Sequence, residues 1–190
     1  MRAVKFLFYR LRDFFSAMLL LAMLGIGCAT TISAKDNASD ILLGEKPSFE
    51  HMASFKSLAE AAPGTDRYEK ARVDYLLERV AKSPYTFLRN GEEHSPARAA
   101  AHLKWKYFRY GDKAPNAELF IENVAAVSNQ SGEPYLLKVS TTEYYPMRIV
   151  LNNELRFLDQ VMQVYREKIK GEEQKRQDSN AEAVKPEQAG

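Results

Sequence analysis

The chain has almost no cysteine, since Cys28 is the only one among its 190 residues. No second thiol exists with which it could form an internal disulfide. Histidine is scarce as well, with three residues. His94 and His102 are eight positions apart, about 12 Å along a helix, which is too far for both to bind one zinc ion. These shortages predict a fold held by its apolar core, with no metal site and no cofactor.

Long hydrophobic runs are absent except near the N-terminus, where residues 14–26 are mostly apolar. This run is shorter than the about 20 residues that span a bilayer. It follows four basic residues and precedes small residues up to Ala34, which is the order found in a secretory signal peptide. Residues 1–34 are therefore predicted to be a signal peptide cleaved after Ala34. The mature chain is then periplasmic and has no transmembrane segment.

Cys28 supports a second interpretation of this leader. Gly27-Cys28 after an apolar run resembles the end of a bacterial lipobox, in which the cysteine is lipidated. A lipobox has an aliphatic residue three positions before the cysteine, whereas Gly25 stands there and Leu24 is one position too early. Soluble export is the favoured interpretation. A lipoprotein anchored to the membrane through Cys28 is the main alternative, and an uncleaved anchor is the third.

An excess of basic residues is also absent outside the leader. Residues 1–34 hold four of the 27 basic and one of the 25 acidic residues, so the remaining chain has a net charge of −1. Nucleic acid is therefore excluded as a partner. An envelope protein, a peptide or a glycan stays open as the partner.

The stretch from Phe87 to Tyr110 contains the clearest structural signals. Asn90-Gly91 is typical of a two-residue β-hairpin turn, because both positions require positive φ. The turn predicts strands over residues 85–89 and 92–94. Ser95-Pro96 is typical of a helix start, and Gly111 of a left-handed helix end. We therefore expect a helix over residues 96–110.

Further helices follow from apolar residues at helical spacing. They are expected at residues 48–60 with Ser48 as cap, 67–82 with Asp66 as cap, 117–127 with Asn116 as cap, and from Pro146 to about Ile169. Residues 135–139 form a compact apolar run that fits a strand paired with residues 85–89. The fold class is therefore mainly α (α+β), a single domain of four to five helices with a minimal antiparallel β-hairpin or sheet.

Composition also predicts the boundaries of this domain. Residues 35–65 are expected to be a flexible lead with a short helix, and residues 66–170 the globular helical domain. Residues 171–190 have no aromatic residue and one valine. Such a segment buries too little apolar surface to offset the entropy of ordering it. We therefore expect a disordered charged tail there.

Several positions within residues 72–158 resemble the YfeK-like family of small exported bacterial proteins, a domain of unknown function. The matching positions are Phe87, Arg89-Asn90-Gly91, His94, His102-Leu103, Phe120-Ile121, Ser128, Ser131-Gly132 and Pro134-Tyr135. The resemblance implies export and a helical domain, with no activity to transfer. The segment 140–146 is longer here than in the family.

No catalytic residue can be assigned from the sequence. It lacks a phosphate-binding glycine loop and a serine-hydrolase elbow, and its serines and histidines form no recognisable triad. This favours a non-enzymatic binding or structural module of the cell envelope. The alternative is a hydrolase of envelope polymers that uses Glu92, Glu93 or Glu122 as general acid.

A candidate ligand-binding surface lies on the helix 96–110. Arg98, His102 and Lys106 follow one another at i, i+4 spacing, and Arg89 lies just before the helix. Guanidinium groups suit carboxylate or phosphate ligands. With His94 and the flanking Trp105, they complete the candidate site: Arg89, His94, Arg98, His102, Trp105 and Lys106. The competing interpretation is a solvated helix face, with His94 bonding locally.

Overall fold

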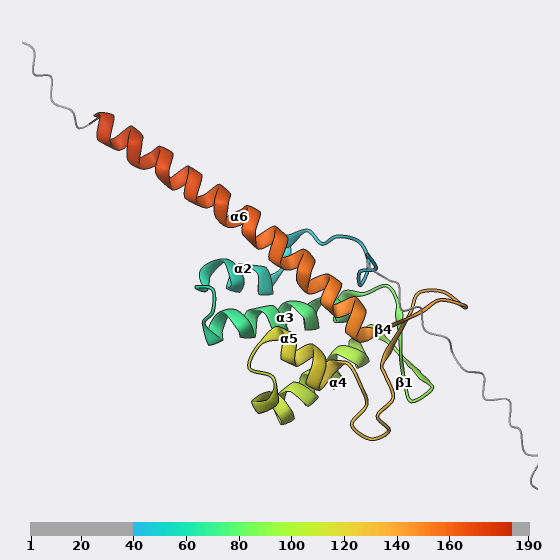
Figure 1. Cartoon of the computed structure of the whole chain (residues 1–190). Helices are drawn as coiled ribbons and strands as arrows, with labels where there is room; N and C mark the ends of the chain where they lie inside the picture. The colour runs from blue at the N-terminus through green and yellow to red at the C-terminus, as the bar shows by residue number, and fades with distance from the viewer. Residues whose placement is uncertain (1–39, 184–190) are drawn as a thin grey trace, which may run out of the picture. The chain divides into compact units, whose positions relative to one another are not determined.

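The computed structural model describes residues 40–183, which contain five α-helices and a four-stranded antiparallel sheet (Figure 1). The helices are α2 (Ala53–Glu60), α3 (Asp66–Lys82), α4 (Pro96–Tyr110), α5 (Ala117–Phe120) and α6 (Met147–Ala183). The strands are β1 (Thr86–Arg89), β2 (Glu92–His94), β3 (Leu136–Lys138) and β4 (Tyr144–Pro146). The expected fold class, mainly α with a small antiparallel sheet, is confirmed. The predicted leader, its cleavage site and Cys28 lie outside the described residues.

Helix α3 lies at the centre of the core. It packs against α2, α4, α5 and α6, and the expected apolar stripe, Val73, Leu76, Leu77 and Val80, is buried. Its N-cap is Thr65, whose side-chain oxygen accepts a hydrogen bond from the Tyr68 amide at 3.3 Å. The predicted cap, Asp66, is instead the first helical residue, because a threonine one position earlier already supplies the capping oxygen.

The sheet has the order β2-β1-β3-β4. Asn90 has φ of 52° and Gly91 of 77°, the left-handed backbone that the hairpin turn requires. The expected pairing of the 85–89 segment with the 135–139 segment is confirmed as β1 against β3, with Phe87 opposite Leu137. Strand β4 was not predicted. It pairs with β3 through Leu137 and Tyr145, and its last residue leads directly into α6.

Helix α4 begins and ends at the expected residues. The Ser95 hydroxyl accepts a hydrogen bond from the Arg98 amide at 3.4 Å, and Pro96 is the first helical residue. Gly111 does not adopt the expected left-handed conformation, because its φ and ψ are −65° and −21°. The chain instead continues into the 3-10 turn η2 (Gly111–Lys113).

Helix α5 has the predicted cap, since the Asn116 side chain accepts from the Leu119 amide at 2.8 Å. The expected helix over 117–127 is not a regular α-helix throughout. After Phe120 it widens into the π-helical turn η3 (Ile121–Ala125). Ile121 and Val124 are nevertheless fully buried, as their spacing predicts.

Residues 40–65, before α3, are packed on the core, whereas the composition of residues 35–65 predicts a flexible lead with a short helix. Leu43 is fully buried, and its amide donates to Oε1 of Glu154 at 2.7 Å. The expected helix over 48–60 is divided into the 3-10 turn η1 (Phe49–His51) and α2, because Met52 between them is extended. The Ser48 side chain makes no capping hydrogen bond.

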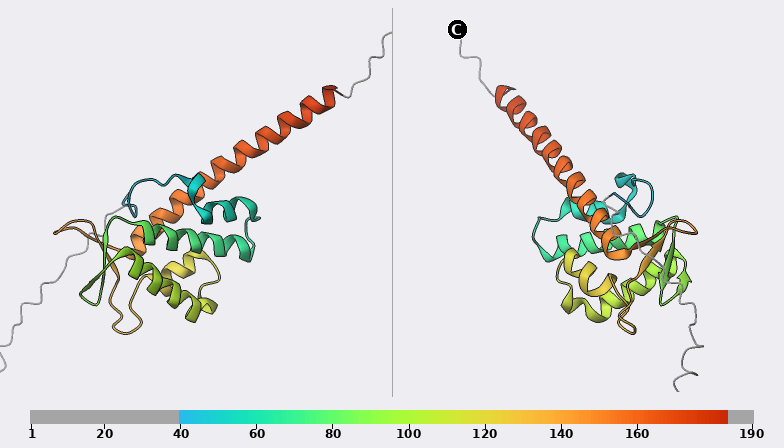
Figure 2. Two further views of the ribbon diagram at one scale, coloured as in Figure 1. Left: turned by 180° about the vertical axis from the view of Figure 1, so that it is seen from behind. Right: turned by 45° about the vertical axis from the view of Figure 1, so that its right-hand side comes forward.

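Helix α6 continues to Ala183, so the expectation of disorder from Gly171 is wrong for residues 171–183. The two views in Figure 2 show this end of α6 extending beyond the other helices. Its residues are mostly good helix formers, and Gln174 donates to Asp178 one turn later at 2.8 Å. Within residues 40–183, no helix combines the length and the apolar character needed to cross a membrane.

Candidate functional site

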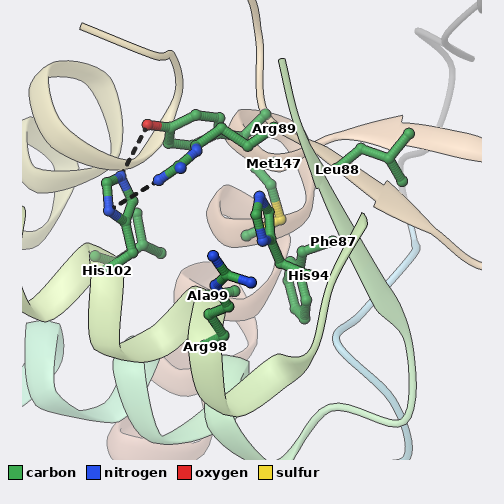
Figure 3. A pocket seen from close by; sticks show the side chains of 10 residues that line it. Phe87, Leu88, Arg89, His94, Arg98, Ala99, His102 and Met147 are labelled. Carbon is green, nitrogen blue, oxygen red and sulfur yellow. Dashed lines mark hydrogen bonds between the residues drawn. The ribbon is translucent and has the colours of Figure 1, made fainter. Parts of the chain in front are cut away.

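Four of the six predicted site residues line one cavity, of about 260 Å³, between the β1–β2 hairpin and the first half of α4. They are Arg89, His94, Arg98 and His102. Figure 3 shows the Arg98 side chain rising from α4 into the space between His102 and His94. Apolar side chains, including Phe87, Leu103 and Met147, form the rest of the wall. The cavity therefore combines an apolar wall with a group of nitrogen-bearing side chains.

The local fold explains why these side chains converge. His94 lies directly opposite Phe87 in the β1–β2 pairing, and Arg89 is two residues further along β1, so all three share one face of the hairpin. Ser95 then starts α4 immediately after β2. Arg98 and His102, one turn apart, follow on the same face of this helix. The tight connection between β2 and α4 thus brings the two groups together.

The charged side chains that line the cavity are all basic. None of the described residues that line it is acidic. Among the ion pairs of residues 40–183, none involves Arg89 or Arg98. Two guanidinium groups without a carboxylate partner attract anions, and their planar donor geometry suits carboxylate or phosphate. The site therefore has the electrostatics of an anion receptor.

His94 has an unusual environment within the site. Its side chain is buried, and neither ring nitrogen has a hydrogen-bond partner within the described structure. Burial lowers the pKa of His94, and the nearby charges of Arg89 and Arg98 lower it further, against a weaker opposing effect of Glu92. The expectation that His94 bonds locally is therefore wrong. The pairing with Phe87 buries the ring without providing it with a donor or acceptor.

His102 is held between Arg89 and Tyr135. Its Nδ1 lies 3.0 Å from Nη1 of Arg89, and its Nε2 lies 3.3 Å from the Tyr135 hydroxyl. Because a guanidinium only donates, Nδ1 must accept, and the proton of the neutral ring is on Nε2. Burial lowers the pKa of His102 to about 4, with added effects of Arg89, Lys106 and His94. The ring is therefore neutral at neutral pH and orients Arg89.

Lys106 is not part of an exposed basic stripe. It is 2% exposed, and its Nζ donates to the Val127 carbonyl at 2.8 Å, beneath the ring of Tyr135. Burial lowers its pKa to about 8, and Arg89 contributes to this shift. The i, i+4 pattern failed here because the segment that follows η3 covers this part of α4. Lys106 therefore has a structural hydrogen bond and does not line the first cavity.

Trp105 lies at a neighbouring second cavity, of about 290 Å³, and is 56% exposed. The two cavities share Arg89, His102 and Tyr135, which form the wall between them. Lys106 also borders the second cavity. The structure thus divides the predicted site residues between two adjoining cavities.

The carboxylates proposed for a hydrolase lie elsewhere. Glu92, Glu93 and Glu122 are all exposed, and none lines either cavity. Glu93 pairs with Lys138, and Glu122 lies 3.6 Å from Arg148. None of the three has the buried position that raises the pKa of a general acid. In the described part of the chain, no group of three or more histidine and acidic side chains is arranged to hold a metal ion.

Sequence reasoning missed Tyr135, Phe87 and Met147 as members of the site. Phe87 and Tyr135 both occur among the positions that match the YfeK-like family, which was a usable signal. No sequence pattern pointed to Met147. It is the first residue of α6, directly after β4, and the pairing of β4 with β3 brings it to the cavity.

Comparison with known proteins places this site within a recognised segment. Residues 67–159 match the model of a family of unknown function (DUF5329). Over 69 residues the chain is 38% identical to an uncharacterized protein, YfeK, of Salmonella typhimurium. The match covers 36% of this chain and spans 58% of the length of that relative. The expected resemblance to the YfeK-like family is confirmed. No solved structure matches the chain.

Proposed function

We propose that this YfeK-like protein is an exported, periplasmic module of the cell envelope that binds an organic anion without transforming it. The ligand, presented by an envelope protein, a peptide or a glycan, carries a carboxylate on a body that has an apolar face. The carboxylate lies against Arg89 and Arg98, and the apolar face lies against the Phe87 and Leu103 side of the cavity. No nucleic acid is a partner.

One observation carries this proposal: the two buried and unpartnered ring nitrogens of His94, in a cavity that has two arginines and no acidic lining residue. A buried polar group without a partner costs about 1–3 kcal/mol. Such groups are rare in folded proteins, and each calls for an explanation such as a bound ion or water. A carboxylate in this cavity accepts from the guanidinium groups and offsets their two charges, and the His94 ring turns to donate its N–H to the same carboxylate.

The proposal is tested with benzoate and the matched neutral amide, benzamide. Benzoate should bind and shift the His94 ring resonances in an NMR titration, and benzamide should bind at least tenfold more weakly. Arg98→Ala should weaken benzoate binding by about 10-fold to 100-fold, since a hydrogen bond to a charged group contributes about 1.5–3 kcal/mol. Arg98 is exposed, so the melting temperature should stay nearly unchanged.

Arg109→Ala is the matched control, because Arg109 is exposed on the same helix but lines neither cavity. It should bind benzoate as the unmodified protein does. Equal benzoate affinity of the Arg98→Ala and Arg109→Ala proteins, measured by calorimetry, would overturn the assignment of the anion site. An NMR titration in which benzoate does not shift the His94 ring resonances would also overturn it.

Export is supported by the order of basic residues, apolar run and small residues within residues 1–34. The mass of the protein recovered from cells tests it. A chain that begins at Lys35 supports soluble export to the periplasm. A diacylated chain that begins at Cys28 would replace it with a lipoprotein on the membrane, and an uncleaved chain would contradict both.

A further inference from the structure

The second cavity, beside the anion site, has a wall of aromatic rings. Trp105 stacks on His102 with ring centres 5.9 Å apart and planes inclined by 26°. Tyr110 meets Trp105 edge-on, with centres 6.4 Å apart and planes at 86°. The Trp105 and Tyr110 rings, nearly at a right angle, form an aromatic corner, and His102 stacks on the Trp105 ring of this corner. The orientation of the half-exposed indole is thus set by its neighbours before any ligand arrives.

Residues with amide side chains also line this cavity. Asn90 comes from the hairpin turn, and Asn129 and Gln130 from the turn before β3. Ser131 Oγ donates to Oδ1 of Asn90 at 2.7 Å, which joins the two turns. The Ser128 hydroxyl accepts from the backbone N–H of Gln130 at 3.3 Å. The amide groups are therefore presented by turns whose positions are fixed by hydrogen bonds.

The composition of the second cavity separates two classes of ligand. None of the described residues that line it is aliphatic, so it offers no apolar pocket in which a leucine or valine of a peptide would be anchored. An aromatic face beside amide donors and acceptors suits a sugar ring. The C–H groups on one side of the ring lie on the negative face of the indole, and its hydroxyls bond to the amides.

We propose that the second cavity is a saccharide subsite and that the ligand of this protein is an oligosaccharide of uronic acids. One sugar ring stacks on Trp105 between the aromatic corner and the amides. The carboxylate of a neighbouring ring reaches past Arg89 and His102 into the first cavity. This inference rests on the proposed anion site. The two cavities adjoin along Arg89, His102 and Tyr135, so two linked sugar rings can occupy one cavity each.

Trp105 is the only tryptophan of the chain, so its fluorescence reports on this subsite alone. The purified protein is titrated with tetragalacturonate and with the matched neutral galactose tetramer. Tetragalacturonate should change the intensity or the wavelength of the emission, and the neutral tetramer should bind at least tenfold more weakly. An unchanged emission with tetragalacturonate, or equal affinity for the two tetramers, would overturn the proposal.

Variants measured by calorimetry locate the contact. Trp105→Ala and Gln130→Ala should each weaken tetragalacturonate binding at least fivefold while benzoate binding stays the same. Both residues are exposed, so the fold should be retained, which circular dichroism checks. Phe108→Ala is the control, because Phe108 is 90% exposed on the same helix and lines neither cavity. An equal loss in the Phe108→Ala protein would contradict the assigned subsite.

The outcomes separate this inference from the proposed function. Benzoate binding without any response to tetragalacturonate overturns the saccharide subsite and leaves the anion site in place. Failure of both ligands overturns both proposals. Tighter binding of a tetrapeptide of glutamate than of tetragalacturonate, with the same change in Trp105 emission, would overturn the saccharide assignment in favour of an acidic peptide.

Discussion

Arg79 and Glu154 form a bidentate ion pair inside the core, with Nε of Arg79 3.0 Å from Oε2 of Glu154 and Nη2 2.9 Å from Oε1. Glu154 is fully buried. It also accepts from the Tyr75 hydroxyl at 3.0 Å and from the Leu43 amide at 2.7 Å. One carboxylate thus joins α3, α6 and the segment before η1. Its hydrogen bonds offset the cost of burying its charge.

Replacement of Glu154 should therefore be severe. We expect Glu154→Gln to lower the free energy of unfolding by about 3–5 kcal/mol, because the buried Arg79 loses its counter-charge. Urea unfolding followed by circular dichroism measures the change. Glu167→Gln, an exposed position on the same helix, should change it by less than about 0.5 kcal/mol. Similar midpoints for the two variants would show that the ion pair contributes little.

Leu43 tests whether the segment before α3 is an integral part of the domain. Leu43→Ala should cost about 2–5 kcal/mol, since it empties space in the core around a fully buried side chain. Leu42→Ala is the adjacent control, because Leu42 is only partly buried and should cost well under half as much. Thermal unfolding compares the two. Equal losses would mean that this segment is not specifically packed.

The hairpin turn provides a backbone prediction. Gly91 has φ of 77°, and a Cβ at this position would meet no atom within 4 Å. The cost of Gly91→Val is therefore conformational strain, about 1–3 kcal/mol, and not a steric clash. Melting temperatures should show a clear decrease for Gly91→Val and almost none for Glu92→Ala. A small effect in both would indicate that the register of β1 and β2 does not depend on this turn.

The partly buried imidazole of His102 makes stability depend on pH. Its pKa is about 4 in the folded protein and near 6.5 when exposed in the unfolded chain, with burial as the main cause and the charges of Arg89, Lys106 and His94 as further ones. The unfolded chain therefore binds a proton more readily as the pH falls from about 6.5 to about 4. Stability due to His102 is complete above this interval and is lost within it.

The difference in unfolding free energy between the unmodified protein and His102→Gln isolates this effect. Between pH 7 and pH 4.5, the unmodified protein should lose on the order of 1 kcal/mol of unfolding free energy relative to His102→Gln. The loss is smaller than the full pKa shift implies, because solvent screens a partly exposed ring. An NMR titration of the ring follows the pKa directly. A difference that stays constant with pH, or a ring that titrates near pH 6.5, would contradict the assignment.

The candidate site was only partly predictable. Spacing along α4 placed Arg98 and His102 together, and the Asn90-Gly91 turn placed Arg89 and His94 near them, because both relations are local. Lys106 follows the same spacing and is buried, since Val127 and Tyr135, more than 20 positions away, cover it. Tyr135 and Met147 enter the first cavity through the pairing of β3 with β1 and β4. A helical pattern holds no information on such distant contacts.

By itself, the sequence determined the parts of this protein whose physics is local. The turn at Asn90-Gly91, the capping of α4 by Ser95 and the apolar stripe of α3 depend on residues within a few positions of one another. The tertiary structure alone decided which polar groups became buried. Leu43 joined the core through Glu154, and His94 lost its partners, because burial and electrostatics depend on every segment that packs nearby. That is why the fold decided which of the candidate residues line one cavity, and the sequence could only suggest it.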